Sequence, residues 1–214
     1  MRVGIFGGTF DPVHVGHLRT AEEIREQYLM DRVYFVPAHI PPHKRNLEIT
    51  DSVLRLIMLR KAMRGNSFLY VSDIEIKNQG VSYSINTIKM FKKKFEELYF
   101  IMGIDAFMEI DTWCSYRDIF NHTNFIIMER PVNAEKKADI SFPSDMRGEI
   151  KKIDGNTFKH VSGNRIYMQK VTQLDISSTK IREAARNGRS IRYHVPQQVE
   201  KFINERKLYR TIVN

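Results

Sequence analysis

The residues with the clearest chemical potential are a glycine pair and two histidines near the start of the chain. Residues 3–6 form an apolar run, Gly7 and Gly8 follow it, and beyond a polar turn stand His14 and His17. Glycines let a backbone approach a phosphate closely, and the first N–H groups of a helix favour negative charge. A strand, a glycine turn and a helix start therefore predict an anion site, and the histidine spacing of three places both side chains beside it.

This glycine turn differs from the common nucleotide-binding loops. A Walker A loop needs a lysine directly after its glycines, and none stands here. A hydride-transfer dinucleotide site needs G-x-G-x-x-G and an acidic residue after the second strand, where this chain has Pro37. Zinc would require further ligands, and neither H-E-x-x-H nor C-x-x-C occurs. The histidines are therefore interpreted as N–H donors to phosphate or as general bases, with a plain turn cap as the alternative for His14.

Strand patterns alternate with helix patterns along most of the chain. Short apolar runs bounded by glycine, proline or polar residues predict strands at 3–6, 33–36, 68–71, 98–102, 124–128 and 166–168. Apolar residues at helical spacing predict helices at 16–29, 51–63, 84–95, 177–187 and 196–208. The polar segment 132–164 is expected to be an insertion with one helix at 144–152.

This alternation predicts an α/β fold, a doubly wound parallel sheet with helices on both faces. We expect a single domain over residues 1–214, with a small helical C-terminal part at about 177–214. Each conspicuous motif follows a predicted strand: the glycine turn, the Pro-Pro-His-Lys loop at 41–44, the Gly-Ile-Asp at 103–105, and Arg130. Ligands of such sheets bind outside the carboxyl ends of the strands, so these motifs are expected to form one composite site.

The composition indicates an ordinary globular protein with a basic surplus. Hydrophobic residues make up 42% and charged residues 28% of the chain, which argues against disorder. The formal charge of +9 would suit nucleic acid, but the basic groups are dispersed and few aromatic residues interleave with them, so no nucleic-acid partner is expected. A cytoplasmic protein without a membrane partner is expected, because Cys114 is the single cysteine and no leader or membrane-length apolar run is visible.

Two motifs near opposite ends of the chain carry a resemblance to a known superfamily. GGTFDPVHVGHL at 7–18 resembles the signature of nucleotidyltransferases with the [HT]-x-G-H motif, and ISSTKIR at 176–182 resembles their I-S-S-T-x-I-R element. Three middle segments look like bacterial nicotinate-nucleotide adenylyltransferases: PAHIPPHK, SYSINTI and FIMGIDAFMEIDTW. The resemblance implies a Rossmann-like nucleotidyltransferase fold. It also implies a reaction of NAD biosynthesis, in which ATP and nicotinate mononucleotide give deamido-NAD and pyrophosphate with Mg²⁺.

Most of the expected site residues belong to the ATP side of this reaction. By the resemblance, His17 and His14 hold ATP phosphates, His17 closest to the α-phosphate under attack. Hydroxyls at a helix start and a planar guanidinium also suit phosphate oxygens on physical grounds alone. The remaining residues expected to bind ATP are Gly7, Gly8, Thr9, Phe10, Gly103, Asp105, Ser177, Ser178, Thr179 and Arg182. No protein ligand for the metal is expected, because ATP phosphates would hold the Mg²⁺.

A second group of residues is expected to bind the mononucleotide. By the resemblance, Trp113 offers a stacking platform for the nicotinate ring, Tyr83 and Ser84 border the ring's pocket, and Lys44 meets the phosphate; Arg130 completes this group. Simpler interpretations stay open: a core tryptophan, a solvated loop lysine, and a helix cap for the aspartate at 105. The chain departs from the family where serine and asparagine, at 84 and 86, replace threonine and aspartate of S-Y-T-x-D-T, and where Val132 replaces the glycine of R-P-G.

Two rival functions stay open at this stage. One is another adenylyltransferase of the same superfamily that uses nicotinamide mononucleotide or phosphopantetheine. The other is a tRNA-binding or other nucleic-acid-binding module, suggested by the net charge of +9. The expected partners are the small molecules ATP and nicotinate mononucleotide, and a homo-oligomer is left open.

Overall fold

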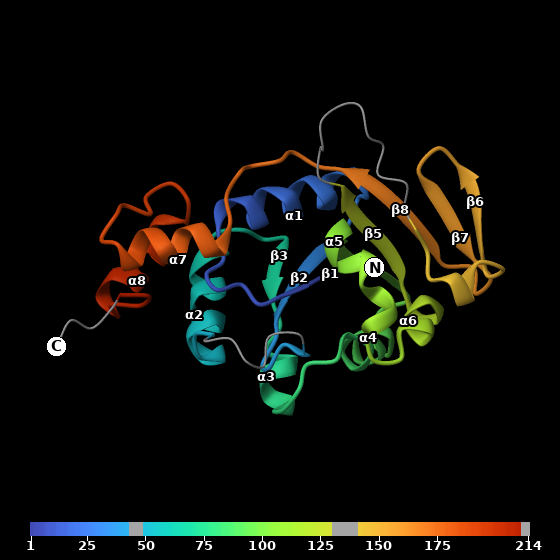
Figure 1. Cartoon of the computed structure of the whole chain (residues 1–214), viewed down its shortest axis with the longest axis horizontal. Coiled ribbons are helices and arrows are strands. Elements are labelled where there is room, and N and C mark those ends of the chain that lie inside the picture. The colour runs from blue at the N-terminus through green and yellow to red at the C-terminus, as the bar shows by residue number, and fades with distance from the viewer. Residues whose placement is uncertain (43–48, 130–140, 211–214) are drawn as a thin grey trace.

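A mixed β-sheet forms the centre of the computed structural model, which describes residues 1–42, 49–129 and 141–210. Within these residues the sheet has eight strands in the order β3-β2-β1-β4-β5-β8-β7-β6 (Figure 1). The strands are β1 (Arg2–Gly8), β2 (Arg32–Pro37), β3 (Leu69–Val71), β4 (Glu97–Gly103), β5 (Asn124–Glu129), β6 (Ile150–Asp154), β7 (Thr157–His160) and β8 (Arg165–Lys170). The six strands from β3 to β8 in the sheet order run parallel, while β7 and β6 are antiparallel.

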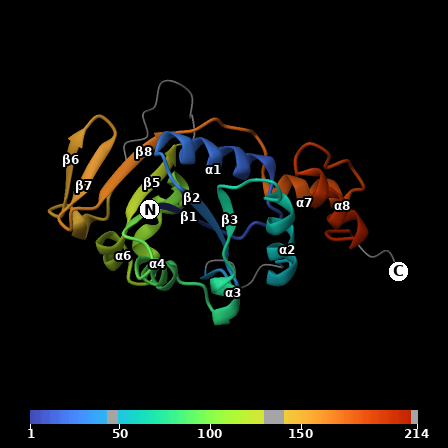
Figure 2. The same ribbon diagram turned by 180° about the vertical axis from the view of Figure 1, so that it is seen from behind.

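Helices cover both faces of the parallel part of the sheet (Figures 1 and 2). They are α1 (Val15–Gln27), α2 (Ser52–Ala62), α3 (Ile74–Asn78), α4 (Ser84–Lys92), α5 (Ile104–Met108), α6 (Tyr116–His122), α7 (Ser178–Arg186) and α8 (Gln197–Glu205). None of the described helices is long and apolar enough to cross a membrane.

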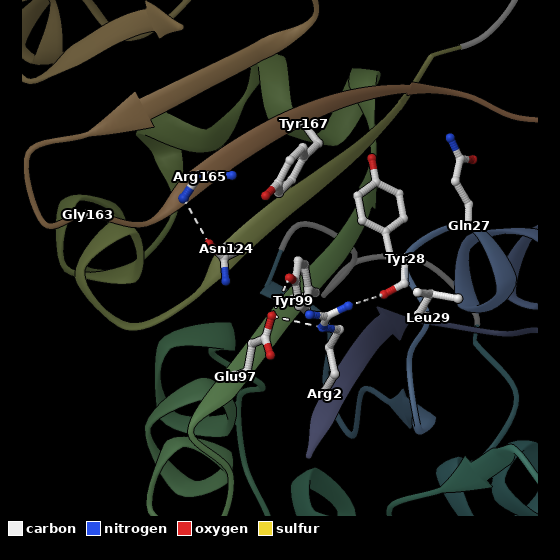
Figure 3. A pocket seen from close by; sticks show the side chains of 10 residues that line it. All are labelled: Arg2, Gln27, Tyr28, Leu29, Glu97, Tyr99, Asn124, Gly163, Arg165 and Tyr167. Atoms are coloured by element: carbon white, nitrogen blue, oxygen red, sulfur yellow. Dashed lines mark hydrogen bonds and ion pairs between the residues drawn. The ribbon is translucent and has the colours of Figure 1, made fainter. Parts of the chain in front are cut away.

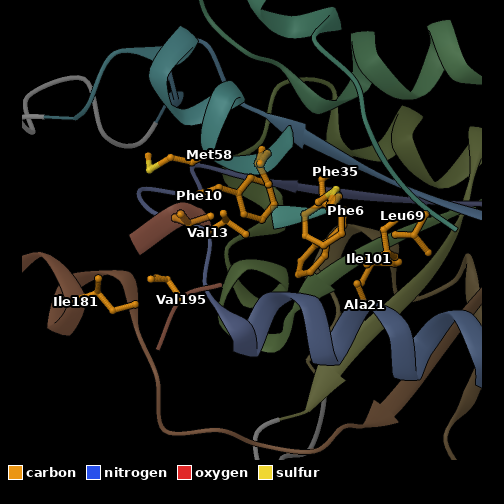
Figure 4. Close-up of a cluster of buried hydrophobic side chains, with 14 of the residues drawn as sticks. Phe6, Phe10, Val13, Ala21, Phe35, Met58, Leu69, Ile101, Ile181 and Val195 are labelled. Atoms are coloured by element: carbon orange, nitrogen blue, oxygen red, sulfur yellow. The ribbon is translucent and has the colours of Figure 1, made fainter. Parts of the chain in front are cut away.

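Strand side chains alternate between two buried clusters, one on each face of the sheet. In β1, Phe6 packs into a cluster with residues of α1, α2, α7 and α8, and part of this cluster is drawn in Figure 4. Its neighbour Ile5 packs on the opposite face with residues of α4, α5 and α6. Strands buried on both faces read as continuous apolar runs, which is why short apolar segments predicted the parallel strands.

The strand order reverses direction between β1 and β4. The chain runs from β1 through β2 to β3 on one side, then crosses to β4 and β5 on the other. The carboxyl ends of β1 and β4 are therefore the topological switch point, where open α/β sheets bind their ligands. Gly8 ends β1 and Gly103 ends β4. The doubly wound Rossmann-like prediction is confirmed for this parallel part.

The two C-terminal helices lie at one end of the molecule. The chain leaves β8, passes over α1 and reaches α7, and α8 packs against α2 (Figures 1 and 2). The apolar positions Ile181, Val199 and Phe202 join the buried cluster of Figure 4, so this part shares the core of the sheet.

The segment before β8 differs from the prediction. A helix at 144–152 was expected, but only a short 3-10 turn at Ser144–Met146 forms there, and β6 and β7 make a hairpin that extends the sheet. The pattern misled because most of β6 is exposed, so no buried face marks its strand period. Main-chain pairing of β7 with β8 places the hairpin instead, and the sheet is mixed rather than wholly parallel.

Candidate functional site

The glycine turn is shaped by the packing of one aromatic ring. Phe10 has a φ of 50° and turns its ring back under the strand end, at centroid distances of 5.7 Å from Phe6 and 5.3 Å from Phe35. A Cβ added to Gly8 would lie 2.9 Å from the Phe10 ring, so this position needs glycine. The side chain of Phe10 thus belongs to the core, while Gly7, Gly8 and Thr9 line a cavity above it.

His14 and His17 cap the start of α1 with their own rings. The N–H of His17 donates to Nδ1 of His14 (3.4 Å), and the N–H of His14 donates to Nδ1 of His17 (3.3 Å). The rings stack with their centroids 3.6 Å apart. Because each Nδ1 accepts a hydrogen bond, each neutral ring carries its proton on Nε2. No described residue accepts from either Nε2, so two adjacent N–H donors remain for a ligand.

The surroundings of both histidines favour the neutral ring. Burial lowers the pKa of His14 to about 4, with a smaller contribution from the nearby His194. Burial lowers the pKa of His17 well below its ordinary value, with His14 as the second cause. Both rings are therefore uncharged near neutral pH, and they can donate hydrogen bonds to an anion without adding positive charge.

The start of α7 lies directly on the turn that follows the glycines. Ser177 caps α7 by accepting from the N–H of Lys180 (3.2 Å), and the Ser178 hydroxyl donates to the carbonyl of Pro12 (2.8 Å). Arg182 donates to the carbonyl of Asp11 (2.7 Å). The structure thus brings the two sequence motifs together across the fold, as their proposed shared role requires.

Two cavities meet at the switch point. One, here called the histidine chamber, has a volume of about 260 Å³, and the other, the tryptophan chamber, about 320 Å³. Both are lined by Phe6 and Gly103, at the ends of β1 and β4. The histidine chamber also contains His14, Gly16, His17, Thr20 and Ser177, and its outer wall is the segment 171–176.

The tryptophan chamber is more apolar and collects most of the residues predicted for the second substrate. Trp113 lies half-buried in its wall, edge-on to Phe100 at a centroid distance of 6.1 Å, with Tyr83 and Ser84 nearby. Ser84 is the first residue of α4, and Tyr83 gives this helix no side-chain cap. The wall therefore contains helix N–H groups that suit an anionic group of a ligand. Trp113 thus packs against the buried cluster on this face of the sheet and also lines the chamber.

One acidic residue of this chamber was missed from the sequence. Glu75 accepts a hydrogen bond from the Thr87 hydroxyl (2.5 Å), and burial raises the pKa of its carboxyl group against the effect of the Thr87 and Ser82 hydroxyls. Glu75 stands in the short helix α3, where the sequence patterns predicted no helix. The periodicity of five residues is too brief to reveal a helix.

Some predicted site residues lie apart from the two chambers. Phe10 is buried, and Asp105, Ser178, Thr179 and Arg182 stand beside the chambers without lining either one. Asp105 lies in the first turn of α5. Lys44 and Arg130 fall outside the described residues. Their proposed contacts with substrates all stay predictions.

The described residues contain no cluster of three histidine, cysteine or acidic side chains placed to hold a metal ion. The donors at the junction of the chambers are instead backbone amides, hydroxyls and imidazole N–H groups. Such a set suits phosphate oxygens better than a bare cation.

Comparison with known proteins identifies the family of this chain. The family model described as cytidylyltransferase-like matches residues 5–184. The chain belongs to this cytidylyltransferase-like family. A family relative from Desulfatibacillum aliphaticivorans, named "Probable nicotinate-nucleotide adenylyltransferase", is 39% identical over 98% of this chain and 100% of its own length. A second with the same name, from Pelobacter propionicus, is 42% identical over 98% of each chain.

Solved structures agree with the cytidylyltransferase-like fold. The Plasmodium falciparum nicotinic acid mononucleotide adenylyltransferase complexed with NaAD has a TM-score of 0.71 and 18% identity, covering 97% of both chains. The same enzyme complexed with APC has a TM-score of 0.69 and 17% identity over 97% of this chain and 96% of its own. At this identity the likeness concerns the fold alone.

Proposed function

We propose that this chain transfers AMP from ATP to nicotinate mononucleotide, giving deamido-NAD and pyrophosphate. The observation that carries the proposal is the pair of chambers that meet at Phe6 and Gly103 beside the two histidines. A reaction between two nucleotides needs two pockets whose contents touch at one point. The names of the full-length relatives support the same reaction.

The chemistry asks for positioning more than for proton transfer. A phosphate oxygen of the mononucleotide attacks the α-phosphorus of ATP, a new P–O bond forms, and the bond to the bridging oxygen of pyrophosphate breaks. The attacking phosphate is already ionised near neutral pH, so no strong base is needed. Catalysis then rests on alignment and on donors that meet the charge developing at the α-phosphate.

His17 and His14 are proposed as those donors. Their neutral rings present two stacked Nε2–H groups, which hydrogen-bond phosphate oxygens without the desolvation cost of a buried cation. The amides of Gly7, Gly8 and Thr9 would line the junction. On the far side of the turn, Ser177, Ser178, Thr179 and Arg182 would hold the β- and γ-phosphates, since the helix start and the guanidinium both favour anions.

The tryptophan chamber is proposed to hold the nicotinate half. Trp113 gives the flat ring a stacking surface, and the uncapped start of α4 at Ser84 gives its carboxylate N–H donors. Lys44 is proposed to bind the mononucleotide's phosphate, and Arg130 is proposed to bind the mononucleotide.

We propose that Mg²⁺ enters bound to ATP, where it would neutralise the triphosphate and assist the departure of pyrophosphate. The imidazole, hydroxyl and backbone N–H groups beside the histidine chamber would then contact phosphate oxygens and not the metal itself. The protein residues then act on the phosphate oxygens that the metal leaves uncovered.

The test is pyrophosphate release from ATP with nicotinate mononucleotide, nicotinamide mononucleotide and phosphopantetheine assayed in parallel. We expect clear preference for the nicotinate compound. The nicotinamide assay is informative because Glu75 places a carboxylate in the chamber wall, and an amide nitrogen could donate to it. Preference for either rival acceptor would overturn the specificity, and tight tRNA binding without pyrophosphate release would overturn the enzymatic proposal itself.

A further inference from the structure

Arg55 is the largest fully buried side chain among the described residues, with 1% of its surface exposed. It stands in the first turn of α2 and points behind the glycine turn rather than into solvent. Arginine is almost never fully buried unless its donors are satisfied. The burial of the Arg55 side chain therefore needs an explanation in the groups that it contacts.

The Arg55 guanidinium is satisfied entirely by main-chain carbonyls. Nε donates to Thr50 (2.8 Å), Nη1 to Thr9 (2.7 Å), and Nη2 to both Ala38 (2.7 Å) and His39 (3.1 Å). No described carboxylate forms an ion pair with it, although Asp11 and Asp51 partly offset the lowering of its pKa by burial. The planar fork thus joins three separate segments through four hydrogen bonds, a pattern that an ammonium group cannot reproduce.

Two of the four acceptors belong to residues that line the tryptophan chamber. Thr9 follows β1 and Ala38 follows β2, and the N–H of Ala38 also donates to the carbonyl of Gly8 (3.0 Å). The neighbouring His39 N–H donates to the hydroxyl of Ser82 (2.8 Å), which precedes Tyr83 in the same wall. Arg55 itself lines neither chamber.

We propose that Arg55 is a positioning residue for the mononucleotide site, which sets the spacing of the Thr9 and Ala38 walls from behind. The inference rests on the proposed function, since it assigns the tryptophan chamber to the mononucleotide. Its contacts include one residue of the proposed ATP group, Thr9, through the carbonyl, and none that lines the histidine chamber, so binding of ATP should depend less on Arg55 than binding of the mononucleotide does.

Arg55→Lys tests this inference, because lysine keeps the charge and loses the fork. Trp113 is the single tryptophan of the chain and stands in the chamber wall, so its fluorescence reports mononucleotide binding without turnover. We expect the Kd for nicotinate mononucleotide to rise by about tenfold, as loss of charge-assisted hydrogen bonds predicts. The KM for ATP should stay within about twofold of the wild-type value. Arg60→Lys is the matched control, since Arg60 lies in the same helix with an exposed side chain.

Different results would contradict the role of Arg55 and the proposed function of the chain. An Arg55→Lys protein that melts earlier but binds the mononucleotide as the wild type does would show a merely structural role and overturn the proposal. Wild-type protein that neither binds nicotinate mononucleotide nor releases pyrophosphate would instead contradict the proposed function. If Arg55→Lys fails to fold, Arg55→Gln provides the second variant, and its unchanged KM for ATP serves as the internal sign of an intact fold.

Discussion

Cavities lie at both ends of the parallel sheet, one at the amino ends of the strands and two at the carboxyl ends. Comparing them favours the two carboxyl-end chambers as the binding site. At the amino ends of the strands, a polar cavity of about 390 Å³ lies over the first residues of β1, β4, β5 and β8 (Figure 3). At the carboxyl ends lie the histidine and tryptophan chambers, of about 260 and 320 Å³. Volume alone therefore does not distinguish the two ends, because the two chambers at the carboxyl end adjoin at Phe6 and Gly103.

The difference lies in what the polar groups contact. In the amino-end cavity Arg2 pairs with Glu97 (2.9 Å), the Tyr99 hydroxyl donates to the same carboxylate (2.7 Å), and Arg2 also donates to the Tyr28 carbonyl (3.1 Å). These groups satisfy one another, as Figure 3 shows. At the other end, the Nε2 donors of the two histidines have no described partner, and helices begin rather than end there. Hydrogen-bond donors that face a cavity without a described partner, together with helix N-termini, indicate a binding site. A cavity whose polar groups already pair with one another lacks this feature.

The largest expected effect is at the carboxyl end. His17→Ala should lower kcat by at least about a hundredfold, because it removes a donor aimed at the developing charge. Steady-state pyrophosphate release measures this. His122→Ala is the control, since that histidine pairs with Asp118 on the surface (3.3 Å) away from both chambers. Near-normal turnover of His17→Ala would remove the histidines from the site.

A fall in pH should lower the free energy of unfolding through the buried histidines at the carboxyl end of the sheet. The folded pKa of His14, about 4, lies below its unfolded value of about 6.5, so the unfolded chain takes up protons first as pH falls between these values. Stability is full above about pH 6.5, and His14 alone should cost on the order of 3 kcal/mol by pH 4. Urea unfolding across this range measures the slope. His14→Asn keeps a side chain that can cap the helix and should make the free energy of unfolding depend less on pH. An unchanged slope in this variant would contradict a buried, neutral His14 as the cause.

A smaller effect is expected within the tryptophan chamber. Trp113→Ala should raise the KM for nicotinate mononucleotide by about tenfold and leave the KM for ATP unaltered, because a stacking surface contributes about 1–3 kcal/mol per base. Tyr193→Ala, which removes an aromatic residue that is 83% exposed, is the control. Equal changes in both KM values would mean that the two chambers do not divide the substrates.

The smallest effect should follow from a change at the amino end. Glu97→Gln breaks the ion pair with Arg2. Both side chains of this pair are about two-fifths exposed, so the loss in the free energy of unfolding should stay below about 1 kcal/mol. Turnover should change by less than about twofold, as for surface substitutions in general. A tenfold loss of activity in this variant would show that the amino-end cavity takes part in function and would overturn the comparison.

The sequence alone could predict the parts whose chemistry is local. The turn from Gly7 to His17 contains its own strand end, glycines and helix start, and the resemblance added the motif at 176–182. Their meeting across the sheet followed from the rule that ligands bind at the carboxyl ends of parallel strands.

Other features depend on partners that sequence spacing does not reveal. Arg55 looked like one charged residue among the apolar positions of α2, and its four carbonyl partners come from segments 5 to 46 residues away. The hairpin of β6 and β7 was equally hidden, because pairing with β8 rather than a buried face fixes it. Main-chain partners leave no trace in a pattern of side-chain types.

The hydrogen bonds that hold the turn after the glycines come from residues that are synthesised much later than the turn itself. The Ser178, Arg182 and Tyr209 side chains meet Pro12 and Asp11 across separations of 166, 171 and 198 residues. During translation the turn leaves the ribosome long before these partners are made. A nascent chain can pair β1 with β2 early, yet the full set of these hydrogen bonds to Pro12 and Asp11 forms only after synthesis has passed Tyr209. Premature termination anywhere before Tyr209 therefore removes at least one hydrogen bond to the turn, although nearly all residues of the candidate site lie upstream.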